Sequence, residues 1–540
     1  MLSLMQDAPL LVSGILDHAR RWHGNQEVVG HALEGGLHRQ SYRATAARSC
    51  QLAHALTDLG AQIGTRIGII AWNTHRHLEL WYGVSGIGAV AHDINPRLSS
   101  QQLAYIIGHA HDEFLFVDIT FAPLVAALRP QCPSVKHVVV MTDAAHQPED
   151  LPGALIYEDL IAGQPETYDW PQLDERSANA LCYTSGTTGN PKGVLYSHRS
   201  NVLHALGVSA KDGGNIGARD VILPAAPMFH ANGWGIPYAA LAHGAKLVFT
   251  GRHIDGPTLH SLIMEEGVTL ALGVPTIALA LLEEAERKGD VWPGLERFII
   301  AGSAAPLSMI EAFDKRGVEV VHCWGMTETS PIGTSSAETA RSAQGSHAER
   351  IAARVKQGRP VFGVDLKITA SDGTVLPHDG QSIGALKVRG PWVLKQYFGA
   401  EGPAVDTDGW FDTGDIACID EDGFMQITDR AKDLIKSGGE WISSVDLENM
   451  VCGYDKISQA AVIGVPHPKW DERPVVIAVA NPETQVSQEE VLDFLKDKVA
   501  KLWLPDTVIF TDALPLGATG KVQKSDLRAQ YADLLQSAAS

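Results

Sequence analysis

A glycine-rich loop at residues 183–193, with the sequence YTSGTTGNPKG, carries the strongest chemical signal in the chain. Its glycines let successive backbone N–H groups face phosphate oxygens without a Cβ in the way. Hydroxyl groups add donors and a lysine adds a cation, so the predicted phosphate-binding residues are Thr184, Ser185, Gly186, Thr187, Thr188, Gly189 and Lys192. The kinase and GTPase pattern GxxxxGK[ST] is absent, because the lysine precedes its glycine. A surface loop without function can have a similar composition, but the complete string argues against that alternative.

A second string, WGMTETSP at residues 324–331, offers the groups that a nucleotide needs. The ring of Trp324 can stack on adenine, and Thr327 can donate to an α-phosphate oxygen. Glu328 can help to hold Mg²⁺, an ion that prefers oxygen ligands and bridges phosphates. Taken alone, Glu328 is typical of a solvated surface acid. The predicted nucleotide-binding residues of this string are Trp324, Gly325, Met326 and Thr327, and Glu328 is the predicted metal ligand.

Two further segments combine small residues with a titratable or aromatic side chain. PMFHANGWG (227–235) sets His230 and Trp234 among glycines, which suits an imidazole facing a carboxylate and a wall of an apolar pocket. GSAAP (302–306) follows an apolar run, and its small residues would let a flat ligand approach the backbone. The alternatives are a structural histidine and a plain strand-to-helix turn, and the second is about equally good from that segment alone.

Two charged residues farther along the chain can fix a ribose. Asp415 ends the string GWFDTGD (409–415), and Arg430 follows fifteen residues later. A carboxylate can accept charge-assisted hydrogen bonds from both hydroxyls of a diol. Each residue alone is typical of a surface charge. Only their occurrence together with the other strings favours a nucleotide site.

These strings, in this order, resemble the adenylate-forming family of acyl- and aryl-CoA synthetases, peptide-synthetase adenylation domains and luciferases, over nearly the whole chain. The resemblance implies that His230 lies by the acyl carboxylate and that Arg430 contacts ribose. It places adenine and the acyl chain near Gly302, Ser303 and Ala304, and it gives an acyl pocket of His230, Trp234, Gly302 and Pro331. The family often has Tyr where this chain has Trp324, so we expect stacking to be kept and a phenol hydrogen bond to be lost.

The same resemblance assigns roles near the C-terminus. Lys432 falls on the family's hinge, about which a C-terminal domain rotates between two half-reactions. The hinge and coenzyme A residues are then Lys432, Lys436, Gly438, Gly439, Glu440 and Trp441. Lys521, in the string PLGATGKVQK (515–524), would bridge the carboxylate and the α-phosphate and neutralise charge that develops in the transition state. The implied catalytic residues are Lys521, Glu328, His230 and Thr184.

The elements that must position these residues follow an α/β pattern. Short apolar runs at 66–72, 113–119, 136–142, 246–251 and 297–303 predict strands, and residues 43–60 predict a helix. Their alternation favours mainly parallel sheets layered with helices. From about residue 360 the pattern changes to β-hairpins, with a loop at 431–441, strands at 460–466, 475–480 and 508–515, and a helix at 487–500. We therefore predict an adenylate-forming domain at 1–430 with a β-rich subdomain, and a mobile α+β domain at 431–540.

Composition excludes some classes of function. The formal net charge of −20 repels nucleic acid and anionic membranes. The six cysteines show no zinc-ligand spacing and suit reduced thiols in a cytoplasmic protein. The N-terminus does not resemble a signal peptide, and no apolar run is long enough to predict a transmembrane helix. Relatives in the family are often homodimers, which is an analogy only.

Together these features predict an enzyme that joins a carboxylic acid to coenzyme A through an acyl-adenylate, using ATP and Mg²⁺ and releasing AMP and pyrophosphate. The chain shows no carrier segment, which argues against a peptide-synthetase module. The overall pattern, including the opening MLSLMQDAPLLVSGIL, resembles 3-methylmercaptopropionate–CoA ligases of dimethylsulfoniopropionate catabolism and medium-chain acyl-CoA synthetases. A medium-chain fatty acid or aryl-CoA ligase is the nearest alternative. A luciferase-like oxygenase and a non-catalytic nucleotide-binding regulator are alternatives of another class.

Overall fold

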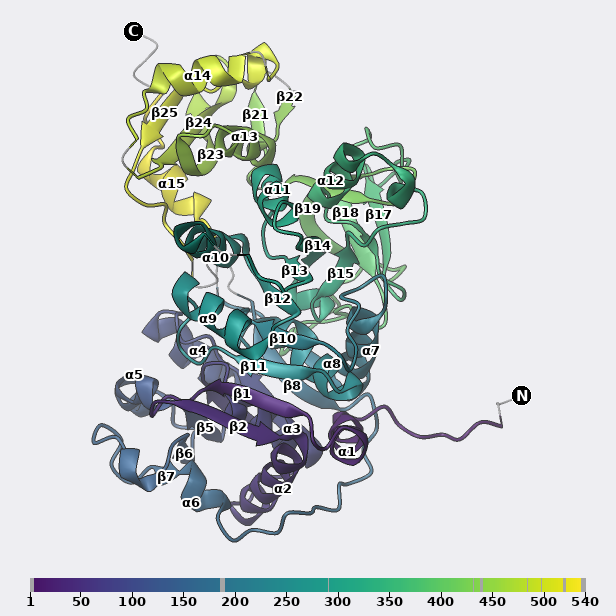
Figure 1. The fold of residues 1–540 in the computed structure, drawn as a ribbon, viewed down its shortest axis with the longest axis vertical. Coiled ribbons are helices and arrows are strands. Elements are labelled where there is room, and N and C mark those ends of the chain that lie inside the picture. Colours follow the sequence, from purple (N-terminus) through teal and green to yellow (C-terminus); the bar gives the residue numbers. More distant parts are fainter. Residues whose placement is uncertain are drawn as a thin grey trace.

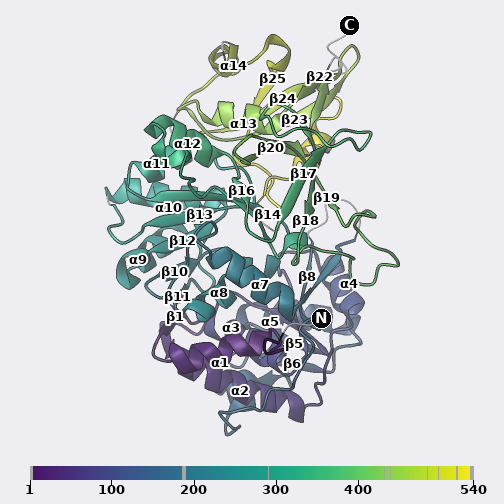
Figure 2. The same ribbon diagram turned by 90° about the vertical axis from the view of Figure 1, so that its right-hand side faces the viewer.

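Two large, mainly parallel β-sheets form the body of the protein, and two smaller sheets follow in the last third of the chain (Figure 1, Figure 2). The structure is a computed structural model, and it describes residues 4–184, 190–289, 291–430, 432–437, 440–482, 484–496, 498–517 and 521–535. In both views the seven-stranded sheet lies at one end of the molecule and the C-terminal sheet at the other.

The first large sheet has, within the described residues, seven strands in the order β7-β6-β5-β3-β4-β8-β9. All neighbours are parallel except β8 and β9, which pair antiparallel. Its inner strands are almost wholly apolar and buried, as expected where both faces of a parallel sheet are covered. The strands are β3 (Arg66–Ile70), β4 (Val90–Asp93), β5 (Phe114–Val117), β6 (His137–Val140), β7 (Leu155–Ile156), β8 (Ala178–Tyr183) and β9 (Gly193–Ser197).

The second large sheet contains nine described strands in the order β16-β15-β14-β13-β12-β10-β11-β1-β2. The six strands from β14 to β1 are parallel, and antiparallel strands close both edges. The strands are β1 (Glu27–His31), β2 (Leu37–Ser41), β10 (Val221–Pro224), β11 (Lys246–Phe249), β12 (Leu270–Gly273), β13 (Arg297–Ile300), β14 (Glu319–Gly325), β15 (Ile332–Ser335) and β16 (Arg359–Pro360). Every strand predicted for the body of the chain is found.

Helices pack on these sheets and connect their strands. The predicted helix at 43–60 is α2 (Tyr42–Asp58), which begins after Ser41, whose hydroxyl accepts from the Ala44 N–H. The other helices of the body are α1 (Val12–Trp22), α3 (His75–Gly86), α4 (Ser100–Ala110), α5 (Ala122–Leu128), α6 (Tyr157–Ile161), α7 (His198–Ser209), α8 (Ile236–His243), α9 (Gly256–Glu266), α10 (Pro275–Lys288), α11 (Leu307–Asp314) and α12 (His347–Val355). None of the described helices combines the length and the apolar character needed to cross a membrane.

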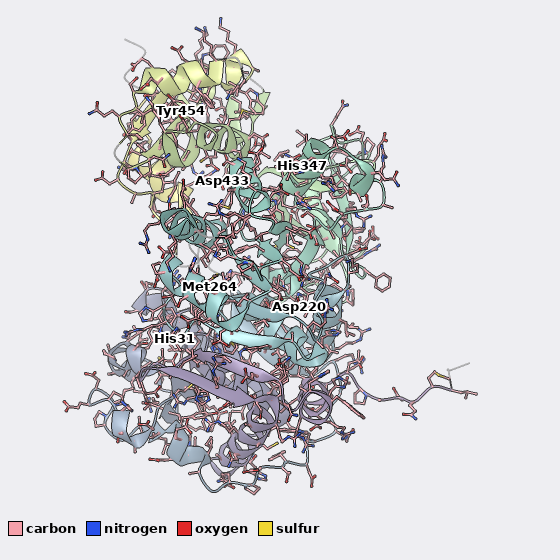
Figure 3. All side chains as sticks on the ribbon, viewed as in Figure 1. His31, Asp220, Met264, His347, Asp433 and Tyr454 are labelled. Atoms are coloured by element: carbon pink, nitrogen blue, oxygen red, sulfur yellow. The ribbon has the colours of Figure 1, made fainter. Side chains whose placement is uncertain are left out.

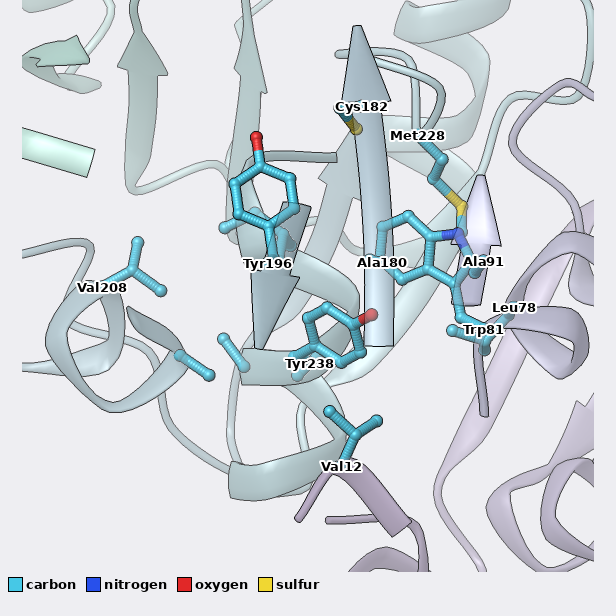
Figure 4. Packing of buried hydrophobic residues seen from close by; sticks show 14 of the residues in the cluster. Val12, Leu78, Trp81, Ala91, Ala180, Cys182, Tyr196, Val208, Met228 and Tyr238 are labelled. Atoms are coloured by element: carbon cyan, nitrogen blue, oxygen red, sulfur yellow. The ribbon is translucent and has the colours of Figure 1, made fainter. Parts of the chain in front are cut away.

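A buried apolar cluster joins the two large sheets (Figure 4). In it Trp81 of α3 stacks on Tyr238 of α8, with ring centroids 5.0 Å apart. Met228, within the predicted string 227–235, and Tyr196, just after the phosphate loop, belong to the same cluster. The loops that carry the predicted chemistry are therefore anchored to one rigid core.

The β-rich region that was predicted after residue 360 is an antiparallel sheet of β17 (Asp365–Thr369), β18 (Gly384–Arg389), β19 (Phe411–Ile419) and β20 (Met425–Arg430). The last sheet contains β21 (Ile435–Ser437), β22 (Glu440–Ile442), β23 (Ile457–His467), β24 (Asp471–Ala480) and β25 (Thr507–Phe510). It is covered by α13 (Ser444–Cys452), α14 (Gln488–Lys496) and α15 (Lys524–Gln530).

Three local expectations were wrong in detail. The strand predicted at 508–515 is β25, which ends at Phe510. The segment 431–441 is more than a loop, because β21 and β22 pair antiparallel within it. The helix predicted at 487–500 ends at Lys496, and a 3-10 turn at Lys501–Trp503 follows. That turn lets Leu502 and Trp503 pack on the C-terminal core, which a continued helix would not allow. The domain boundary at about residue 430 stays a prediction.

Candidate active site

A buried hydrogen bond joins two of the predicted nucleotide residues. The Trp324 indole N–H donates to Asp415 Oδ2 over 2.9 Å, and both side chains are buried. Gly333 lies against the indole ring, since a Cβ on Gly333 would approach it to 2.4 Å. The side chain at this position therefore makes a hydrogen bond without a phenol, through its ring N–H. Sequence reasoning missed this bond, although Trp is a donor as well as an aromatic ring.

Arg430 stands beside the same carboxylate. Asp415 of β19 and Arg430 of β20 are direct partners across the antiparallel pair, and the Arg430 Nε lies 3.3 Å from Asp415 Oδ1. Strand register thus unites two charges that are fifteen positions apart in the sequence. The carboxylate, held from both sides, is preorganised to accept hydrogen bonds from a diol.

Glu328 lies in a 3-10 turn, Thr327–Thr329, directly after β14. Its side chain is buried, and burial raises the pKa of its carboxyl, while a hydrogen bond from Tyr397 and the charges of Arg430 and Lys192 act in the opposite direction. The Tyr397 hydroxyl donates to Glu328 Oε1 over 2.7 Å. The Thr327 carbonyl accepts from the buried hydroxyl of Tyr196, which fixes the turn to β9. Tyr397 was not predicted, because a single tyrosine in hairpin sequence carries no signal of its own.

The phosphate loop begins and ends on two paired strands, β8 and β9. Thr184 and Lys192 close it through two hydrogen bonds, from Thr184 N to the Lys192 carbonyl at 2.9 Å and from Lys192 N to Thr184 Oγ1 at 3.3 Å. Tyr183 and Gly193 pair directly below them on β8 and β9. Five predicted residues of the loop lie outside the described residues: Ser185, Gly186, Thr187, Thr188 and Gly189.

Lys521 of the C-terminal region lies inside this site. Its Cε is 3.8 Å from the position that a Cβ on Gly302 would occupy. The pKa of Lys521 is lowered to about 8, first by burial and then by the charges of Arg430 and Lys432, while Asp415 and Glu328 act in the opposite direction. The structure therefore brings the lysine to the nucleotide residues across a large sequence distance.

Two of the predicted acyl-pocket residues, His230 and Gly302, lie near Lys521. His230 precedes the 3-10 turn Ala231–Gly235, and burial together with the charge of Lys521 lowers the pKa of its imidazole to about 4. A neutral imidazole can donate a hydrogen bond to a carboxylate without carrying a charge itself. Trp234 has a left-handed backbone with φ 58°, which is unusual for a bulky residue, and packs partly buried against the core. Pro331 follows Ser330 at the start of β15, and Ser303 is exposed beside Ala304 in the β13–α11 loop.

The residues assigned to the hinge and the thiol step are only partly described. Burial lowers the pKa of Lys432. Asp433, the next residue and labelled in Figure 3, pairs with Arg528 of α15 over 2.6 Å. Lys436 points to the C-terminal sheet instead of the nucleotide residues, with its Nζ 3.7 Å from Asp471. Gly438, Gly439 and the side chains of Glu440 and Trp441 lie outside the described part.

Within the described part of the chain, no group of three or more His, Cys, Asp or Glu side chains could hold a metal ion by itself. A single carboxylate such as Glu328 suits Mg²⁺ all the same, because this ion keeps several waters and is bound largely by substrate phosphates. One oxygen of Glu328 is occupied by Tyr397. The described residues therefore fit a cation that arrives with ATP.

Comparison with known proteins decides the family. The family model "AMP-binding enzyme" matches residues 16–398, and "AMP-binding enzyme C-terminal domain" matches residues 446–521. The chain belongs to the AMP-binding enzyme family. The fold class predicted from the sequence is confirmed by the solved structures that the chain resembles.

Three individual proteins illustrate the similarity of this AMP-binding enzyme to known ligases. The chain is 50% identical to 3-methylmercaptopropionyl-CoA ligase of Ruegeria lacuscaerulensis, over 99% of this chain and 100% of the relative. It is 48% identical to medium-chain-fatty-acid–CoA ligase of Ectopseudomonas oleovorans, over 99% and 98%. The crystal structure of anthranilate CoA ligase AuaEII with anthranoyl-AMP matches with a TM-score of 0.87, at 25% identity, over 99% and 100%.

The predicted reaction class is thereby confirmed. The protein is an acyl-CoA ligase that uses ATP and forms an acyl-adenylate. The roles of individual residues stay predictions, although the structure now gives the positions of those that it describes.

Proposed function

We propose that this ligase activates 3-methylmercaptopropionate, or another short- or medium-chain carboxylic acid, and transfers the acyl group to coenzyme A. The observation that carries the proposal is the near-complete match to a 3-methylmercaptopropionyl-CoA ligase at 50% identity. The medium-chain-fatty-acid ligase at 48% identity supports the wider range of acids and is the second candidate. Trp234, partly buried at the predicted acyl pocket, is consistent with a short pocket.

In the first half-reaction the substrate carboxylate attacks the α-phosphorus of ATP, and pyrophosphate leaves. His230, neutral at pH 7, orients the carboxylate. Protonated Lys521 bridges the carboxylate and the α-phosphate, where negative charge develops. Asp415 and Arg430 hold the ribose, and the loop from Thr184 to Lys192 cradles the leaving phosphates. A bound Mg²⁺ supplies charge neutralisation at the phosphates, and Glu328 is the residue that would hold it.

In the second half-reaction the thiolate of coenzyme A attacks the acyl-adenylate and releases AMP. We propose that residues 1–430 and 431–540 are separate domains and that rotation about Lys432 removes Lys521 between the two steps. Support comes from the strand boundaries, because β20 ends at Arg430 and β21 already belongs to the C-terminal sheet. Catalysis then rests on positioning and charge, with no covalent bond to the protein.

A panel of acids tests the substrate. We expect pyrophosphate release and acyl-CoA formation with ATP, Mg²⁺, coenzyme A and 3-methylmercaptopropionate or butyrate, followed by mass detection of the thioester. Faster turnover of hexanoate or octanoate would favour the medium-chain alternative. Faster turnover of benzoate would favour the aryl alternative. Absence of turnover with every acid from two to twelve carbons would contradict the proposal. Light emission with a heteroaromatic acid, without acyl-CoA, would indicate the luciferase alternative instead.

The pH dependence tests the role of Lys521. Because its pKa in the free enzyme is lowered to about 8, the lysine is protonated below pH 8 and neutral above it. We expect kcat/KM for pyrophosphate release to be flat from pH 6 to 7.5 and to fall about tenfold per pH unit above 8. The Lys521→Arg variant should keep its residual rate constant to pH 9.5, since a guanidinium stays charged. A wild-type profile without a limb near pH 8 would contradict this role.

We also propose that the enzyme is a cytoplasmic homodimer. Every cysteine of the chain is a free thiol, and four are buried, which is consistent with a reducing compartment. The dimer rests on analogy with the family. Light scattering coupled to size-exclusion chromatography would give the mass of the assembly, and one chain weighs 58.0 kDa.

A further inference from the structure

The segment at residues 391–399, which lies in the connection between β18 and β19, is tied to Glu328 in two ways. The Leu394 N–H donates to the Glu328 carbonyl over 2.7 Å. The Tyr397 hydroxyl donates to Glu328 Oε1, also over 2.7 Å. One bond therefore fixes the backbone of Glu328 and the other fixes its carboxylate.

The same segment is also tied to the phosphate loop. The Phe398 N–H donates to the Gly193 carbonyl over 2.8 Å, at the point where the loop joins β9. The Lys192 ammonium lies 4.9 Å from the centroid of the Tyr397 ring, within the range of a cation–π contact. Tyr397 thus contacts a predicted phosphate ligand with its ring and the predicted metal ligand with its hydroxyl.

A hydrogen bond holds the Glu328 carboxylate on the side of this segment. A cavity of about 450 Å³ adjoins the segment and is lined among others by Glu328, Ser330, Tyr397 and Gly399. A glutamate side chain can adopt several rotamers, so the groups that bond to its carboxylate help to set its direction. Among the described residues, Tyr397 is the one whose side chain donates a hydrogen bond to this carboxylate.

We propose that Tyr397 is a positioning residue that aims the Glu328 carboxylate and the Lys192 ammonium at one target, the leaving pyrophosphate with its divalent cation. The inference rests on the proposed roles of Glu328 and Lys192 and adds the residue that sets their geometry. Both roles belong to adenylation, because pyrophosphate leaves in that step. Substitution of Tyr397 should therefore slow the first half-reaction and weaken cation binding. It should leave the rate of thiol transfer unchanged.

The Tyr397→Phe variant tests this assignment, because it removes the hydroxyl and keeps the ring. We expect the Mg²⁺ concentration for half-maximal pyrophosphate release to rise about tenfold, the effect of losing one hydrogen bond to a charged group. Conversion of preformed acyl-adenylate and coenzyme A to acyl-CoA should stay within twofold of wild type. Mn²⁺ binding to the complex with α,β-methylene-ATP, measured by electron paramagnetic resonance without any acid, should weaken by a similar factor.

Tyr157→Phe is the matched control, since Tyr157 donates to Glu79 over 2.7 Å in a buried ion-pair network of the N-terminal region. It should leave the Mg²⁺ and Mn²⁺ dependence unchanged. Unchanged cation dependence in Tyr397→Phe would overturn the inference, as would an equal loss in both half-reactions with a lowered melting temperature. The Mn²⁺ measurement needs no turnover, so it decides the inference even if no acid in the panel is a substrate and the proposed function fails.

Discussion

Replacement of Lys521 by Ala is expected to slow adenylation about 10²–10³-fold while leaving thiol transfer within about threefold of wild type. The loss corresponds to about 3–4 kcal/mol of transition-state stabilisation, the usual effect of removing one preorganised group at a developing charge. Lys521 is placed for this role beside Gly302 and His230, with Asp415 and Glu328 contributing negative charge to its surroundings. Single-turnover release of pyrophosphate measures the first step, and preformed acyl-adenylate with coenzyme A measures the second.

The split between the two steps separates a ligase from the alternatives. Lys501→Ala, at an exposed position of the same C-terminal region, is the control and should change neither step. Equal losses in both half-reactions would contradict the proposal that the domain carrying Lys521 turns away before thiol transfer. A full rate of adenylation in Lys521→Ala would remove the lysine from the mechanism altogether.

Much of the architecture follows from local sequence. Apolar runs such as those at β3 and β5 are long enough for one buried strand each, and helical stretches separate them, so parallel sheets were predictable. The antiparallel β17–β18 pair was predictable from the β-hairpin pattern that begins near residue 360. The ends of the elements were harder to predict. Helix α14 ends early because Trp503 packs on the core from a separate turn, which is a tertiary effect with no local sequence signal.

The chemistry of the site was predictable only where a string of residues stays together. The loop at 183–193 and the turn around Glu328 each contain their own donors and charges. By contrast, nothing in the residues around Lys521 says that it meets Gly302, since that contact depends on how the C-terminal sheet sits on the body. The family resemblance supplied this expectation, and the structure supplies its geometry.

The contacts of Tyr397 and Trp324 could not be predicted from residue type alone. A tyrosine between two strands is ordinary, and only the fold shows that its hydroxyl meets Glu328. The replacement of Tyr by Trp at position 324 suggested a lost hydrogen bond, because the phenol was considered alone. The indole N–H reaches Asp415 because the fold brings one residue of β14 and one of β19 together from two different sheets, which is a tertiary relation.

Replacement of Asp415 by Ala should have the second large effect, a rise of about 10²–10³-fold in KM for ATP. A carboxylate that accepts two hydrogen bonds from a ribose contributes roughly 3–4 kcal/mol when the bonds are charge-assisted. The substitution also leaves the buried N–H of Trp324 without its acceptor and Arg430 without its neighbouring charge. The proposed ribose contact would act equally in the ground state and the transition state, so kcat should fall much less than kcat/KM.

Two matched variants locate the cause of that loss. Trp324→Phe removes the ring N–H and keeps the carboxylate, so KM for ATP should rise only about tenfold. Asp412→Ala removes an exposed carboxylate on the same strand, 3.5 Å from Lys387, and should change KM less than twofold. Equilibrium binding of AMP, measured by calorimetry, should rank the three variants in the same order of lost affinity without any turnover. If Asp415→Ala and Asp412→Ala bind AMP equally well, the ribose contact assigned to Asp415 is wrong, and the buried Trp324–Asp415 pair serves only to join β14 to β19.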